Sequence, residues 1–286
     1  MKLPAFDYAA PKTLIEAIEL LATHDEALPL SGGQSLLPIL AFRLAAPSLL
    51  VDLRRIPGLD RINISAHGVE LGAGVRWCDI EADTRLAMAH PLLAEAVTYV
   101  AHYAIRSRGT VGGSLAHADP AAELPGIALT CDAEIIAVGR NGIRCIAARD
   151  FFVGPMMTCL AHDELVTGLR MPSWPPLRRW AFEEFARQHG AFAMAGIALY
   201  YDLRDGVATN VHIGVIGASA ALQRLTPAEA VLEGRIVDAA AMLETAQAAA
   251  AAIDAVNDID APAAYRCSLV ETLTGRALQR AATRTH

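Results

Sequence analysis

The feature that constrains this chain most is a glycine-rich stretch, residues 106–125, with the sequence RSRGTVGGSLAHADPAAELP. It places Gly112 and Gly113, with two arginines and several small or hydroxylic side chains, between an apolar helical pattern and the start of another helix. Because glycine has no Cβ and adopts positive φ easily, successive backbone N–H groups of such a loop can converge on one phosphate oxygen. The stretch therefore predicts a loop that binds an anion.

The end of this stretch predicts how the loop meets the next helix. Asp119 followed by Pro120 is typical of an N-cap and a first helical residue. We therefore expect Asp119 to stabilise the loop as a cap, and the loop to end on the positive end of a helix. Glu123 would lie on the first turn of that helix, where its carboxylate can accept hydrogen bonds from hydroxyl groups of the same ligand.

A second glycine pair, Gly32 and Gly33, stands in a similar setting. A short apolar run precedes it at residues 28–30, and Gln34 and Ser35 open another apolar segment, which predicts a strand, a tight loop and a helix. A single Gly-Gly pair is as readily a plain turn without a ligand. Two such loops with a basic flank favour binding, and together they could hold the two phosphates of a dinucleotide.

These two segments resemble the flavin loops of the FAD-binding medium subunits of the molybdenum hydroxylases, a family that includes carbon monoxide dehydrogenase, the xanthine dehydrogenases and related aromatic-heterocycle hydroxylases. Residues 31–36 (SGGQSL) resemble the first flavin loop, and residues 106–125 closely resemble the second. The similarity continues in order from Phe6-Asp7-Tyr8 to Tyr265-Arg266 and Arg276-Ala277-Leu278.

The resemblance implies an α+β fold of the molybdenum hydroxylase and vanillyl-alcohol-oxidase-like type. Two FAD-binding subdomains would hold FAD between them, and a C-terminal three-stranded antiparallel sheet with a helical bundle would follow. The order of the expected elements gives an N-terminal βαβ FAD-binding subdomain at residues 1–55, a middle α+β FAD-binding subdomain at 56–175 and the C-terminal domain at 176–286. The proline-rich segment SWPPL at residues 173–177 supports the last boundary. The C-terminal strands are expected at residues 180–187, 195–203 and 211–216.

The resemblance also implies roles for individual residues. Backbone amides of the two glycine segments would hold the pyrophosphate, Glu123 would bind the ribityl or adenosine part, and the backbone at Val166 would meet the flavin ring. Phe192 would lie beside that ring, where relatives often have tyrosine, although on sequence alone it is as readily a core aromatic. The full set of implied cofactor-binding residues is Ser31, Gly32, Gly33, Gln34, Ser35, Leu36, Thr110, Val111, Gly112, Gly113, Ser114, Asp119, Glu123, Val166 and Phe192.

The resemblance implies a division of labour among subunits as well. FAD in this chain would pass electrons from the [2Fe-2S] clusters of a small iron–sulfur subunit to an external acceptor. A separate large subunit would hold the molybdopterin cofactor and oxidise the substrate. The expected assembly is a heterotrimer that pairs into a dimer of heterotrimers, with the substrate and the final acceptor left open.

Composition excludes several other classes of protein. The chain of 286 residues is 53% hydrophobic and 19% charged, with a net charge of −7. Nucleic-acid binding needs a clustered cationic face, so this composition argues against a nucleic-acid-binding protein. No apolar run reaches the length of a membrane span and the N-terminus lacks a signal-peptide core, so we expect a cytoplasmic protein. The five cysteines include no Cys-x-x-Cys and the nine histidines no metal-like grouping, which argues against a metal site or cluster in this chain.

Two other functions remain open at this level. A stand-alone FAD-dependent oxidase or dehydrogenase of a small organic substrate would need a general base above the flavin, for which His117 and His189 are the nearby candidates. A flavin-free scaffold module would have kept the fold and lost the cofactor, and the intact glycine pairs argue against it. Flavin absorbance of the purified protein distinguishes the scaffold, and reduction by an organic substrate without partner subunits distinguishes the oxidase.

Overall fold

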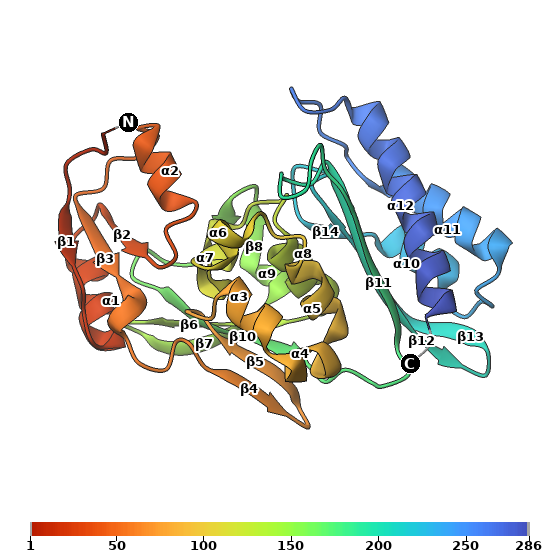
Figure 1. Ribbon diagram of the computed structural model, residues 1–286, viewed down its shortest axis with the longest axis horizontal. Coiled ribbons are helices and arrows are strands. Elements are labelled where there is room, and N and C mark those ends of the chain that lie inside the picture. Colours follow the sequence, from red (N-terminus) through yellow and green to blue (C-terminus); the bar gives the residue numbers. More distant parts are fainter. Residues whose placement is uncertain (1, 285–286) are drawn as a thin grey trace.

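The computed structural model describes residues 2–284, which form three units in a row (Figure 1). The N-terminal unit is a parallel sheet with the strand order β1-β3-β2. Helix α1 begins after Thr13, whose hydroxyl accepts a hydrogen bond from the backbone N–H of Glu16, and it buries Ala17, Ile18 and Leu21. The elements are β1 Asp7–Ala9, α1 Leu14–Thr23, β2 Ala27–Leu30, α2 Leu36–Ala41 and β3 Leu49–Asp52, followed by a 3₁₀ turn Leu53–Arg55.

The middle unit is a five-stranded antiparallel sheet with the order β4-β5-β10-β6-β7. The sequence Arg140-Asn141-Gly142, a strong hairpin signal, forms the turn that joins β6 to β7, and Gly142 has a φ of 102°. The helices of this unit lie on one side of the sheet (Figure 1), where they enclose a large apolar core. The five strands of this sheet are β4 Ile62–Ser65, β5 Gly68–Gly72, β6 Glu134–Gly139, β7 Gly142–Ala147 and β10 Leu165–Pro172, and a separate two-stranded sheet consists of β8 Phe152–Gly154 and β9 Met157–Thr158. The helices of the middle unit are α3 Trp77–Ala82, α4 Thr84–Ala89, α5 Pro91–Val97, α6 Tyr103–Arg106, α7 Val111–His117, α8 Glu123–Thr130 and α9 Ala148–Phe151.

The C-terminal unit is an antiparallel sheet with the order β11-β12-β13-β14; helices α10 and α12 pack against the sheet, and α11 packs against these two helices. The sequence predicted three strands; the fourth, β14, is two residues long, too short to show an alternating pattern. Asp205-Gly206, a dipeptide typical of hairpin turns, joins β12 to β13 with φ values of 51° and 82° that fit a tight hairpin. The elements are β11 Arg179–Phe185, β12 Ala195–Arg204, β13 Val207–Ile216, β14 Gln223–Arg224, α10 Thr226–Leu232, α11 Ala239–Ala252 and α12 Ala263–Thr283.

A buried arginine on α12 connects the C-terminal unit to the middle one. Arg266 donates to the carbonyls of Met194 and Gly217 at 2.6 and 2.7 Å and pairs with Asp258. The N–H of Gly217 in turn donates to the carbonyl of Pro120 at 2.9 Å. This chain of contacts holds the segment between α7 and α8, where the sequence placed Asp119 and Glu123.

Candidate functional site

A cavity of about 1140 Å³ opens where the three units meet. It is lined by the first glycine segment, by α7 and the residues before it, by part of β10 and by the turn at residues 190–192. Its volume exceeds the range of about 300–1,000 Å³ that is typical of small-molecule pockets, so it has room for a ligand of dinucleotide size. Of the predicted cofactor-binding residues, all line this cavity except Val111, which is buried in the core.

The first glycine segment is the tight loop that the sequence predicted between β2 and α2. Gly33 has a φ of 73°, in the left-handed region that favours glycine, and the side-chain amide of Gln34 donates to the carbonyl of Gly32 at 3.1 Å. Within residues 2–284, no group accepts a hydrogen bond from the backbone N–H of residues 32–35. Since buried backbone donors are almost always paired, a row of unpaired donors on a cavity wall is suited to an anion.

In the second glycine segment, residues 111–117 form the helix α7, so the prediction of a loop at Gly112 and Gly113 was wrong. Thr110 is the N-cap of α7, and neither Gly112 nor Gly113 has a positive φ. The N–H groups of residues 111–114 all have acceptors within the chain: the carbonyls of Val75 and Ala73, and the hydroxyl and carbonyl of Thr110. These amides are therefore not free to hold a phosphate, and the segment offers the cavity its side-chain hydroxyls instead.

Both glycines of this helix are required by close contacts. A Cβ at Gly112 would lie 2.5 Å from the Cβ of Ala73, because α7 packs directly on the turn after β5. A Cβ at Gly113 would lie 2.9 Å from the hydroxyl oxygen of Thr110 and would meet no other atom within 4 Å. Gly112 thus serves helix packing, whereas Gly113 keeps the cavity wall open.

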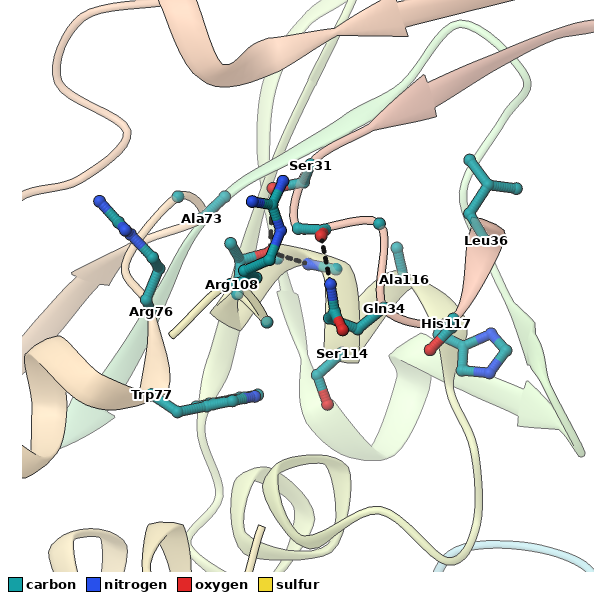
Figure 2. Close-up of a pocket in the computed structure, with 18 of the residues that line it drawn as sticks. Ser31, Gln34, Leu36, Ala73, Arg76, Trp77, Arg108, Ser114, Ala116 and His117 are labelled. Atoms are coloured by element: carbon teal, nitrogen blue, oxygen red, sulfur yellow. Dashed lines mark hydrogen bonds between the residues drawn. The ribbon is translucent and has the colours of Figure 1, made fainter. Parts of the chain in front are cut away.

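The structure brings the two glycine segments into contact. The hydroxyls of Ser31 and Thr110 are hydrogen-bonded at 2.9 Å across 79 positions of sequence. Gly32 packs on the carbonyl of Arg108, which a side chain at position 32 would clash with. Figure 2 shows Ser31, Gln34 and Ser114 arranged around the same space, with Trp77 below them and its ring nitrogen directed toward the centre.

Asp119 and Glu123 follow α7, and only one of them occupies its predicted place. Ala118 ends α7 with a φ of 53°, and the carboxylate of Asp119 accepts from the N–H of Ala121 at 2.9 Å. The helix begins at Glu123 with Ala122 as its N-cap, so Asp119 caps a turn and the prediction of a helix cap at Asp119-Pro120 was wrong. Glu123 is the first residue of α8 and lines the cavity, in the first turn as predicted.

A second carboxyl group near Glu123 was not predicted. Burial raises the pKa of Glu123 to about 7, and the carboxylate of Asp119 adds to this effect. Burial raises the pKa of Glu184, on β11, to about 8, and repulsion from Glu123 contributes. Oε2 of Glu184 is buried and has no hydrogen-bond partner among the described residues. The sequence of β11 could have indicated this buried carboxyl group. Successive side chains of a strand point to opposite faces, so one of the adjacent residues Glu183 and Glu184 must face inward.

We expect the cofactor-free chain to lose stability as the pH rises through the range set by these two groups. An ordinary glutamate has a pKa of 4.5, whereas the folded chain keeps the proton of Glu123 until about pH 7 and that of Glu184 until about pH 8. The folded state therefore binds more protons in between, and the free energy of unfolding falls as the pH rises. At about 1.4 kcal/mol per pH unit, the loss from Glu123 is at most about 3 kcal/mol.

Urea unfolding of the FAD-free chain between about pH 5 and about pH 8 measures this loss. In the variant Glu184→Gln the free energy of unfolding should fall less with rising pH than in the wild type, up to about pH 8. In Glu123→Gln it should also fall less, but only up to about pH 7. Equal slopes in the wild type and both variants would contradict the assignment of these groups.

The cavity is also lined by the residues expected beside a flavin ring. Val166 lies on β10 next to an irregularity in the pairing with β6, and its side chain is buried. Phe192 lines the cavity with 71% of its surface exposed, so it is not a core aromatic. Such an exposed ring on a cavity wall is suited to contact with a planar ligand.

Three histidines stand near the cavity. His117 lines it, as does His102, which the sequence did not single out. His189, the other candidate base, packs against His102 with ring centroids 6.3 Å apart. None of them is hydrogen-bonded to a carboxylate that would orient it as a base, within the residues that the structure describes. The arrangement gives no support to a self-contained oxidase.

The residues present fit a dinucleotide with a flat ring system. The first loop lines the cavity and has unpaired amides, Gly113 leaves space that a side chain would fill, and the exposed ring of Phe192 lines the same cavity. Between residues 2 and 284 there is no cluster of three or more His, Cys, Asp or Glu that could hold a metal ion. No helix in the same range is long and apolar enough to cross a membrane.

Comparisons with known proteins cover the whole chain. Residues 4–174 match the family described as the FAD binding domain in molybdopterin dehydrogenase, and residues 180–281 match the CO dehydrogenase flavoprotein C-terminal domain. The nicotine 6-hydroxylase medium subunit of Paenarthrobacter nicotinovorans is 39% identical over 285 residues, 100% of both chains.

Two solved structures show the same fold over nearly their full length. A chain of carbon monoxide dehydrogenase from Hydrogenophaga pseudoflava superposes with a TM-score of 0.97 at 33% identity, covering 100% of both chains. A chain of quinoline 2-oxidoreductase from Pseudomonas putida 86 superposes with a TM-score of 0.94 at 36% identity, covering 99% of this chain and 98% of that one.

Proposed function

The chain belongs to the FAD-binding medium subunits of the molybdenum hydroxylases, and from this premise we propose how its cavity serves that role. A medium subunit is the FAD-carrying oxidoreductase subunit of a complex with a small iron–sulfur subunit and a large molybdopterin subunit. When bound, FAD takes electrons from the iron–sulfur clusters and delivers them to an external acceptor. The chain's own residues bind and orient this cofactor.

The observation that carries the proposal is the row of unpaired amides at residues 32–35 beside the Ser31–Thr110 contact. We assign these amides to the pyrophosphate, with the hydroxyl of Ser114 as a further donor on the opposite segment. Glu123 accepts hydrogen bonds from ribityl or ribose hydroxyls, and Phe192 with the backbone at Val166 borders the ring. In this assignment α7 contributes its position and its side chains, and the first loop contributes the amides.

At a pH above about 7, where Glu123 is ionised, replacing it with alanine is expected to weaken FAD binding by about 1.5–3 kcal/mol, the usual contribution of a hydrogen bond to a charged group. The expected increase in the FAD dissociation constant is therefore about 10- to 100-fold. Quenching of flavin fluorescence during titration of the stripped chain measures it. The matched control is Glu164→Gln, at a carboxylate that lines the cavity but is already paired with Arg144. Equal affinity in Glu123→Ala and the wild type would refute the role of Glu123.

We further propose that the complex hydroxylates a nitrogen heterocycle rather than oxidising carbon monoxide. The relatives named for nicotine and quinoline are 39% and 36% identical to this chain, against 32–34% for the chains from carbon monoxide dehydrogenases. Anaerobic reduction of the assembled complex by candidate heterocycles, followed by flavin absorbance, tests this proposal. Reduction by carbon monoxide and by none of the heterocycles would overturn it.

The proposed compartment is the cytoplasm, and the proposed assembly is a dimer of heterotrimers. All five cysteines of the chain are free thiols, as is usual where glutathione keeps thiols reduced. Fractionation of the source cells with an antibody against this chain tests the compartment, and the native mass of the purified complex tests the assembly.

A further inference from the structure

The two arginines of the second glycine segment have different environments. Arg106 is committed to the fold, because its guanidinium pairs with Glu81 at 2.8 Å and donates to the carbonyls of Val100 and Ala101. The side chain of Arg108 lines the cavity, and no carboxylate or other acceptor within residues 2–284 bonds to it. A guanidinium has five donors and is always charged, so an unpaired one on a cavity wall is suited to an anion.

The position of Arg108 directs it to the first glycine loop. Its carbonyl is in direct contact with Gly32, so the backbone of residue 108 adjoins the unpaired amides. In Figure 2 the Arg108 side chain extends toward Ser31, while that of Arg76 extends to the other side. Arg76 is also partly neutralised, since it lies 3.7 Å from Asp79 and donates to the carbonyl of Ser107.

The charges that line the cavity include four carboxyl groups and four arginines. The carboxyl groups are those of Asp60, Asp119, Glu123 and Glu164, and the arginines are Arg54, Arg55, Arg76 and Arg108. Arg54 pairs with Asp52 and Arg76 lies beside Asp79, so among the described residues Arg55 and Arg108 are the arginines of the lining without an acidic partner. Of these two, Arg108 adjoins the first glycine loop. A pyrophosphate brings two further negative charges into this space. Repulsion between these groups would weaken binding unless a cation stood near the phosphates.

We propose that Arg108 binds the pyrophosphate of FAD through its side chain, as a cation that adds to the neutral amides of residues 32–35. This inference rests on the proposed function, because it takes FAD as the ligand. It assigns Arg108 to recognition of the phosphates, so flavins without a pyrophosphate would gain nothing from it. Since the side chain is exposed, its contribution should decrease as salt screens the charge.

The experiment uses the full-length chain stripped of its flavin and titrated with FAD and with riboflavin, at low and at high salt. Arg108→Gln should raise the dissociation constant for FAD about tenfold at low salt and less at high salt, because it removes a hydrogen bond between charged groups. Binding of riboflavin should stay unchanged, and Arg108→Lys should restore most of the FAD affinity. The matched control, Arg76→Gln, should bind FAD like the wild type.

The outcomes separate this inference from the proposed function. If Arg108→Gln binds FAD with the affinity and salt dependence of the wild type, the inference is overturned, while FAD binding by the wild type still supports the proposed function. An equal loss of FAD and riboflavin affinity would also overturn it, since the effect would then be on the shape of the site. Failure of the wild-type chain to bind FAD at all would instead overturn the proposed function.

Discussion

The variant Gly113→Val is expected to lose FAD while the chain remains folded. Gly113 lies in the first turn of α7, and a Cβ there meets only the hydroxyl of Thr110 at 2.9 Å before it opens into the cavity. A valine side chain would therefore fill space beside the Ser31–Thr110 contact and disturb the capping hydroxyl. Weakening of the N-cap costs about 1 kcal/mol, far less than the stability of a chain of this size.

The flavin-to-protein ratio after purification measures the effect, and circular dichroism with a thermal melt shows that the variant is folded. The matched control is Gly275→Ala in α12, where the nearest atom to the added Cβ is 4.0 Å away. This control should keep its flavin and gain slight stability from better helix propensity. Gly112→Ala should behave in the opposite way to Gly113→Val and destabilise the fold, because its Cβ would meet Ala73 at 2.5 Å. Normal flavin content in Gly113→Val would contradict the assignment of the cavity as the FAD site.

The second large effect concerns electron flow in the assembled complex. We expect no oxidation of an organic substrate by the isolated chain, and substrate-dependent reduction of its flavin once the iron–sulfur and molybdopterin subunits are added. Among the described residues no group of His, Cys, Asp or Glu could hold a metal ion, and the histidines near the cavity have no hydrogen-bonded carboxylate that would orient them as bases. Stopped-flow absorbance at the flavin band, with and without the partners, measures the difference. Turnover of substrate by the pure chain would support the stand-alone oxidase instead.

Much of the fold could be predicted from local patterns. The hairpin at Arg140-Asn141-Gly142, the helix after Thr13 and the turn at Asp205-Gly206 each depend on a few adjacent residues with strong conformational preferences, and the structure has all three. The two-residue strand β14 has no such local signal. It forms because the neighbouring strand β13 offers a free edge, which is information from the tertiary structure.

The position of the site in the chain could be predicted from the sequence, but the backbone conformation of its glycine segments could not. Glycine permits positive φ and also permits close packing, and sequence alone does not say which of these a given glycine serves. Gly33 uses the first property, whereas Gly112 uses the second against Ala73. The amides of α7 that were expected to be free are also occupied: those of Val111 and Gly112 donate to carbonyls of the turn after β5, and those of Gly113 and Ser114 donate to the hydroxyl and the carbonyl of Thr110.

Charged residues that depend on distant partners were the hardest to assign. Glu184 comes close to Glu123 only because β11 of the C-terminal unit packs beside the middle unit. Arg106 and Arg108 are two positions apart in sequence, yet one is bound by Glu81 and the other faces the cavity. The partner of each charged side chain comes from another helix or strand. The sequence around the residue therefore cannot show whether its charge stabilises the fold or binds a ligand.

The most direct test of the account is the cofactor content of the isolated chain. The chain purified alone, after expression without its partners, should show a flavin spectrum that dithionite bleaches, with about one FAD per chain and no bound iron, sulfide or molybdenum. Acid release and chromatography should identify the flavin as FAD. A stoichiometric iron–sulfur cluster in the pure chain, or a folded chain that neither retains nor takes up FAD, would contradict the central claim.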